Sequence, residues 1–265
     1  MNRHVLLLLG VTAVWGTTFP LLKSLLVSLS GVEISALRFV IAALCLAPFL
    51  RRVPRHTWRD GVVLGAMALV SYVAQAYGLE FISSNRSAFL TSLNVLMVPL
   101  IGAAMGARLS ARVLVCALAY AGYIIALSGR AGRHDLRQLA AAQIAVMALL
   151  ACAWLLGAAL LSAKPSDLLA RATAHWVALT YLGVIATAAM LFLQALGQRG
   201  LSADKSAVIF AMEPVFAALT AWLWLGELLT GRAAMGAALV LAAVILSELK
   251  PRRSPHQSSI SSIVE

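Results

Sequence analysis

The chain has 265 residues, of which 62% are apolar and 12% are charged, and its mean hydropathy is +0.90. Soluble domains carry about 25% charged and about 45–50% apolar residues, so this composition excludes an ordinary soluble protein and indicates a polytopic membrane protein. The net charge of +11 does not indicate a nucleic-acid-binding protein. The Arg and Lys residues fall mainly in short gaps between apolar runs, as in the basic cytoplasmic loops of membrane proteins.

Nine apolar stretches are long enough to cross a bilayer, since a spanning helix needs about 20 residues. In chain order they are residues 5–28, 33–50, 61–81, 87–106, 112–128, 138–162, 175–198, 205–225 and 232–249. We therefore predict an all-α, polytopic transmembrane helix bundle. No Ala-x-Ala-like cleavage site follows the first stretch before Lys23, so we expect a retained span rather than a signal peptide. Residues 251–265 are mostly polar and are expected to form a disordered tail.

A polar segment between spans occurs twice, and the two copies are 119 residues apart (194 minus 75). Four residue types coincide without a gap at this offset: Gln75/Gln194, Gly78/Gly197, Ser83/Ser202 and Ser87/Ser206. A repeat of this kind predicts a duplicated bundle with a substrate path between its halves. We place the first repeat at residues 1–130, with five spans, and a shortened second repeat at residues 131–250, with four.

The sequence predicts that one helix is absent between Ser128 and Leu139. Nine alternating spans divide the 19 basic residues that lie outside spans into 10 inside and 9 outside, whereas an added span between Arg130 and Arg133 gives 14 and 5. The positive-inside rule favours the second count, so the chain behaves as a ten-span protein without its sixth helix. With four spans in the second repeat, its last three would insert parallel to their counterparts. The alternative is that residues 129–138 cross the membrane as extended chain, because ten residues reach about 33 Å.

An ordered series of short motifs resembles the EamA-type transporters of the drug/metabolite transporter superfamily. The residues that carry this resemblance are Val14–Pro20, Leu37–Phe39, Gln75–Leu79, Ser87–Leu93, Glu213–Ala217, Leu225–Glu227 and Gly236–Val240. The resemblance covers nearly the whole chain and implies two inverted five-helix repeats, of which this chain lacks one helix. It also implies gradient-driven movement of small metabolites or drugs. In keeping with that, the sequence contains no Gly-x-x-x-x-Gly-Lys-Ser/Thr phosphate loop.

Glu213 is the leading candidate for a functional residue, because it lies in the middle of a predicted span, just before Pro214. An acidic residue there costs about 2.5–3.5 kcal/mol by insertion scales, so it should face the protein interior or a water-filled path. It can bind a proton or a cationic group, or it can bridge two helices. Asn94 is its equivalent at the 119-residue offset and shares a helix face with Thr91. We predict that both faces converge on a midplane substrate pathway; the alternative is interhelical hydrogen bonding.

Five further polar or aromatic residues are assigned to the pathway, each with a structural alternative. Gln75 and Gln194 are either gate residues or structural amides between helices. Trp15 and Tyr72 either line a cavity or pack in the core. Arg38 either attracts anions at the mouth of the pathway or extends its charged end to the membrane interface.

The competing functions are a secondary transporter, expected to work as an exporter, and a shortened, transport-inactive or regulatory relative. An enzyme is not expected, because the sequence has no His-Glu-x-x-His motif and no Gly-x-Ser-x-Gly motif. The three cysteines are isolated, so no cofactor or metal site is expected. The expected partners are the lipid bilayer of the cell inner membrane, a small-molecule substrate and a coupling proton. Gly102–Gly106 fits Gly-x-x-x-Gly, which serves packing within the bundle or a homodimer contact.

Overall fold

The computed structural model describes residues 3–81, 83, 84, 87, 88, 111–162, 167–226, 231, 235 and 238. Its elements are α1 (Arg3–Leu25), α2 (Gly31–Leu46), the 3₁₀ segment η1 (Ala47–Leu50), α3 (Arg55–Phe81), α5 (Ala111–Arg130), α6 (Leu136–Ser162), α7 (Leu168–Ala174), α8 (Trp176–Thr180), the π-helical segment η2 (Tyr181–Ala189), α9 (Met190–Gln198), α10 (Ala203–Phe210) and α11 (Glu213–Leu225). No strand occurs in these described residues, which confirms the all-α prediction.

Six helical stretches of the described residues are long and apolar enough to cross a membrane. They are residues 3–25, 31–50, 55–81, 136–160, 176–198 and 205–225, and each matches a predicted span. Large apolar side chains are exposed on their outer faces, for example Leu160 on α6 and Leu223 on α11, as expected for helices in contact with lipid. Nearly all of the predicted span 87–106 and nearly all of the predicted span 232–249 lie outside the described residues.

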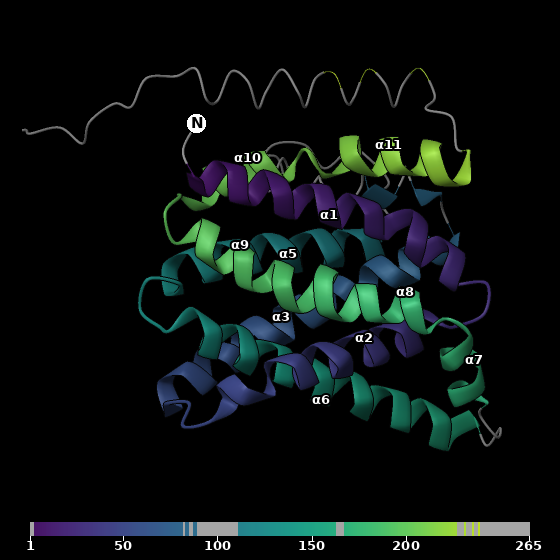
Figure 1. Cartoon of the computed structure of the whole chain (residues 1–265), viewed down its shortest axis with the longest axis horizontal. Coiled ribbons are helices and arrows are strands. Elements are labelled where there is room, and N and C mark those ends of the chain that lie inside the picture. Colours follow the sequence, from purple (N-terminus) through teal and green to yellow (C-terminus); the bar gives the residue numbers. More distant parts are fainter. Residues whose placement is uncertain are drawn as a thin grey trace, which may run out of the picture.

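The two halves of the bundle pack against each other in matching ways (Figure 1). Helix α1 packs against α9, and α5 packs against α3; likewise α2 packs against η2, and α6 packs against α3. Helices α5 and α6 therefore pack around α3 in the same way as α1 and α2 pack around the segment formed by η2 and α9. Helices α2 and α6 contact each other.

Contacts between α1 and the segment formed by η2 and α9 give the relative directions of the helices in the two halves. A Cβ atom on Gly197 of α9 would meet Leu8 of α1, whereas Trp15, further along α1, donates a hydrogen bond to the Ala186 carbonyl, which lies earlier in the chain. Helix α1 is thus antiparallel to α9. Because α1, α2 and α3 alternate through short connections, α3 is also antiparallel to α9, and the two halves are inverted. The expectation that the last spans insert parallel to their counterparts is therefore wrong for this segment.

The connection between α5 and α6 is a tight turn. Helix α5 ends at Arg130, the backbone N–H of Arg133 donates to the Arg130 carbonyl, and α6 begins at Leu136. The alternative of an extended crossing at residues 129–138 is therefore wrong. Helix α5 already runs antiparallel to α3, because Asp60, near the start of α3, pairs with Arg130 at the end of α5.

Basic residues of the described chain gather at one end of this inverted bundle. The connections and helix ends at this end carry Arg3, Arg51, Arg52, Arg55, Arg59, Arg130, Arg133, Arg137, Arg199 and Lys205. The opposite end, where α1 meets α2, where α5 begins and where α7 lies, carries Arg112 and Arg171 among the described residues, with Lys23 near it in the last turn of α1. Ten described basic residues at one end against three at or near the other is the asymmetry that the positive-inside rule predicts. The described bundle has this charge asymmetry without a helix between α5 and α6.

Two departures from regular α-helix interrupt the second half. Helix α10 ends at Phe210 and α11 begins at Glu213, so the predicted span 205–225 is broken at Ala211 and Met212. Pro214 explains the break, because it has no N–H to donate and its ring clashes with the carbonyl four residues earlier. The second departure is η2, where the Thr187 hydroxyl bonds the carbonyl of Leu182 five residues back. Such segments occur frequently at functional sites.

Helices α1 and α11 approach closely at Gly16. A Cβ atom at this position would lie 2.5 Å from the Phe216 Cβ and 2.8 Å from the Ala217 backbone nitrogen. Only a residue without a side chain allows this approach, which brings α11 and its first residue Glu213 against α1.

We predict that Gly16→Ala lowers the free energy of unfolding by about 1–3 kcal/mol, because the added methyl group overpacks a rigid helix contact. Thermal unfolding of the purified protein in detergent measures the change. Gly10→Ala on the same helix is the matched control, since a Cβ atom there meets nothing within 4 Å. Equal melting temperatures for the two variants would contradict the close approach.

Candidate functional site

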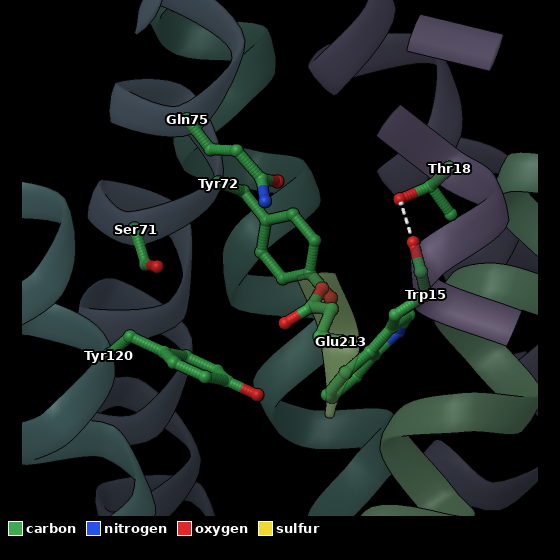
Figure 2. A pocket seen from close by; sticks show the side chains of 7 residues that line it. All are labelled: Trp15, Thr18, Ser71, Tyr72, Gln75, Tyr120 and Glu213. Atoms are coloured by element: carbon green, nitrogen blue, oxygen red, sulfur yellow. Dashed lines mark hydrogen bonds between the residues drawn. The ribbon is translucent and has the colours of Figure 1, made fainter. Parts of the chain in front are cut away.

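A pocket lies between four helices of the bundle (Figure 2). Helix α1 contributes Trp15 and Thr18, α3 contributes Ser71, Tyr72 and Gln75, α5 contributes Tyr120, and α11 contributes Glu213. The lining combines three aromatic rings with neutral polar groups and a single acid. Pockets of this kind, mostly apolar with a few polar groups that fix orientation, are typical small-molecule sites.

The Glu213 carboxylate is the one charged group among the described lining residues. Glu213 is only 5% exposed and is the first residue of α11, directly after the break in the predicted span. Figure 2 shows its carboxylate between the Tyr72 and Trp15 side chains. Within the described part of the chain it forms no hydrogen bond and no ion pair. The N-terminal end of α11 gives a carboxylate some stabilisation through the helix dipole, but it supplies no counter-charge.

The aromatic walls are held by their own contacts behind the pocket. The Trp15 indole nitrogen donates to the Ala186 carbonyl of η2 at 2.9 Å, and its ring meets the Tyr120 ring edge-on at a centroid distance of 6.3 Å. Phe210, the last residue of α10, packs against both rings, with centroids at 5.7 Å and 6.2 Å. The walls are therefore rigid, whereas the space that they enclose is open.

Arg38 lies behind Tyr72 rather than at the membrane interface. Its guanidinium carbon is 4.7 Å from the centroid of the Tyr72 ring, and its Nε donates to the Thr187 hydroxyl at 3.0 Å. The residue is 2% exposed, so it does not extend to the membrane interface. Its assignment as an anion-attracting charge of the pathway stays a prediction. The cation–π contact and the Thr187 bond accommodate the buried charge, although Nη2 has no hydrogen-bond partner within the described residues.

Gln194 takes part in a separate buried network. The Tyr123 hydroxyl lies 3.2 Å from the Gln143 side-chain oxygen and 3.3 Å from that of Gln194. A hydroxyl has one hydrogen, so it donates to one amide oxygen at a time. If the other side-chain amide is flipped, its NH₂ donates to the hydroxyl oxygen. This network joins α5, α6 and α9, and it favours the structural alternative for Gln194.

The pocket brings together four of the eight residues assigned from the sequence, namely Trp15, Tyr72, Gln75 and Glu213. Asn94 and Thr91 lie outside the described residues. The other three lining residues, Thr18, Ser71 and Tyr120, were not among those assigned from the sequence. Tyr120 stands three residues before Tyr123, and this spacing on one helix face was the available signal. No group of three or more His, Cys, Asp or Glu side chains that could hold a metal ion occurs among the described residues.

Comparison with known proteins agrees with this architecture. A curated protein of Archaeoglobus fulgidus, described as an uncharacterized transporter, is 28% identical over 271 residues, which cover 91% of this chain and 84% of the relative. A solved crystal structure of another protein superposes with a TM-score of 0.68 at 16% identity and covers 94% of this chain and 98% of that one. At this identity the second likeness concerns the fold alone.

Inverted helical halves around a polar pocket define a multi-pass membrane protein of the transporter class. The model of the EamA-like transporter family matches residues 2–120 and again residues 112–249, so the chain belongs to this family. Both matches include residues 112–120 in the first part of α5. The repeat boundary at residues 130 and 131 stays a prediction.

We predict that Tyr123→Phe lowers the free energy of unfolding by about 1 kcal/mol, because it leaves a buried amide without its partner. Solute binding in the pocket should be unchanged, since Tyr123 is not in the lining. Thermal unfolding and equilibrium binding on the same sample measure the two quantities. A loss of binding without a loss of stability would return Gln194 and its network to the substrate pathway.

Proposed function

We propose that the protein is a secondary transporter that moves small organic metabolites or drugs across the cell inner membrane, in the direction of export. The pocket is the solute site, and it is exposed alternately to the two sides as the inverted halves rock against each other. The basic end of the bundle faces the cytoplasm, as the positive-inside rule requires.

The carboxylate of Glu213, which has no partner among the described residues, carries this proposal. A buried carboxylate without a counter-charge is costly within the membrane, so it is neutralised either by a proton or by a positively charged group of the solute. If the two compete for the same oxygen atoms, solute binding expels a proton, and the proton gradient drives export. Transport is then coupled to the membrane gradient without ATP.

Rigid placement of the acid supports this role. Glu213 stands at the break between α10 and α11, and the close approach at Gly16 holds α11 against α1. Transporters commonly build their solute sites at such discontinuous helices near the bilayer midplane.

The alternative function is a shortened relative that keeps the fold but does not transport. The missing span favours it. The intact pocket favours transport, because an acid at this depth has a cost that an idle scaffold does not need to keep.

We predict that Glu213→Gln abolishes solute flux in proteoliposomes while inserted, folded protein remains. The amide keeps the size of the side chain but cannot bind and release a proton. Glu80→Gln, at the exposed end of α3, is the matched control and should retain flux. Flux that is unchanged in Glu213→Gln at all pH values would exclude the proton role, and absence of flux in the unaltered protein across a metabolite panel would favour the inactive relative.

A further inference from the structure

We propose that the solute of this transporter is an organic cation whose positive group sits beside Glu213 and against the aromatic walls. This inference rests on the proposed function and adds the charge of the solute to it. The described lining contains one formal charge, and that charge is negative. An anionic solute in the same space would face the carboxylate without a compensating cation.

The aromatic side chains supply the second half of the recognition. Trp15, Tyr72 and Tyr120 line the same pocket as Glu213, and in Figure 2 the Tyr72 and Trp15 side chains flank the carboxylate. The negative faces of aromatic rings attract ammonium groups, and this attraction is strongest where water is excluded. Alkylated ammonium groups suit such a site, because they have little hydration to lose.

Arg38 does not cancel this preference. Its guanidinium is directed at the face of Tyr72 and at Thr187, and it is not part of the lining. Tyr72 therefore separates the buried cation from the pocket.

Equilibrium binding to the purified full-length protein tests the charge of the solute. The probes are phenyltrimethylammonium, neutral benzamide and anionic benzoate. We expect the cation to bind at least tenfold more tightly than the other two, and Glu213→Gln to remove this preference. Tyr120→Leu should weaken cation binding by roughly 2- to 30-fold, whereas Tyr120→Phe, which keeps the ring, should not. Trp222→Leu, on the exposed face of α11, is the control.

Equal or tighter binding of benzamide or benzoate would overturn the cation assignment, and so would a preference that survives in Glu213→Gln. The proposed function fails separately. Glu213-dependent flux of a neutral or anionic solute would refute the charge of the solute and leave the transporter standing.

A different set of contacts carries a second inference, which concerns two polar clusters at opposite ends of the bundle. At one end, the Arg171 guanidinium on α7 makes two hydrogen bonds to the Glu33 carboxylate at 2.8 Å and 3.0 Å. It also donates to the Ser28 carbonyl and to Asp167, and the Ser28 hydroxyl bonds the His175 ring at 2.9 Å. The hydrogen bonds that Arg171 donates to Glu33 and Asp167 raise the pKa of Arg171, so it stays charged. We name this set the α7 cluster.

At the other end, Asp60 near the start of α3 receives two partners, one from the end of α5 and one from the α5–α6 turn. Arg130 Nε lies 3.0 Å from Asp60 Oδ1, and His134 Nε2 lies 2.8 Å from Asp60 Oδ2. The second ring nitrogen of His134 bonds the Thr57 hydroxyl at 3.0 Å, and the His56 ring stacks on the His134 ring. We name this set the α3 cluster. Its His56 and the His175 of the α7 cluster differ by 119 positions (175 minus 56), which is the offset of the internal repeat.

The two clusters are equivalent in the inverted architecture. The α7 cluster joins the α1–α2 connection to the segment that leads into η2 and α9. The α3 cluster joins the α5–α6 connection to the start of α3. Helix α2 with η1 separates them along the chain, which places them about 30 Å apart at opposite ends of the bundle (Figure 1). Both clusters are closed in this structure.

We infer that the two clusters are the gate latches of the transporter: access to the pocket from one side requires one of them to break while the other stays closed. Ion pairs at the partly exposed ends of helices suit this use, because they are strong enough to hold a contact and weak enough to be released. Because the two clusters are equivalent in the inverted halves, breaking one or the other gives two states of similar energy that open to opposite sides.

Side-specific labelling of the pocket tests the latches. In a variant with Cys45, Cys116 and Cys152 replaced by serine, Thr18→Cys places a thiol in the pocket wall, and a membrane-impermeant thiol reagent is applied to vesicles of each orientation. We expect Arg130→Ala to raise labelling several-fold from the cytoplasmic side and Arg171→Ala to raise it from the opposite side. Asp60→Asn and Glu33→Gln should reproduce these two results. Arg59→Ala, an exposed basic residue beside the α3 cluster, is the control.

Equal labelling from both sides in the four variants, or labelling that does not change in any of them, would overturn the inference. Either outcome would reduce the clusters to structural contacts of the helix ends.

Discussion

The organisation of this protein depends on one unfavourable group, the Glu213 carboxylate, which lies buried at the start of α11 with no counter-charge among the described residues. Burial of such a group in a membrane protein is tolerated only where something else neutralises it during the working cycle. The surrounding structure is built to keep the group there. Pro214 breaks the helix, Gly16 lets α11 approach α1, and Trp15 is fixed by the Ala186 carbonyl.

Inversion of the two halves is the second constraint. It makes α1 pack against α9 as α5 packs against α3, and it places an ion-pair cluster at each end of the bundle. It also gathers most of the described basic residues at one end, which gives the protein a defined orientation in the membrane. Pocket, clusters and orientation are therefore consequences of one symmetric arrangement rather than independent features.

Sequence reasoning predicted most of the architecture, because composition, span length and the repeated Gln and Gly residues report burial and duplication directly. It also selected Glu213, Gln75, Tyr72 and Trp15, since a polar or aromatic residue inside an apolar span stands out. It failed where three-dimensional packing decides the outcome. The burial of Arg38 depends on Tyr72 from α3 and Thr187 from η2, and the burial of Gln194 depends on Tyr123 from α5. The charge count failed for a related reason. It assumed that successive predicted spans alternate in direction, which makes α5 parallel to α1, whereas α5 runs antiparallel to α1.

The most direct test of the central claim is to count the protons that the purified protein releases when it binds phenyltrimethylammonium in weakly buffered solution. If Glu213 exchanges a proton for the solute, binding releases protons from the unaltered protein and releases none from Glu213→Gln. Binding without proton release, or equal release from both proteins, would contradict the account.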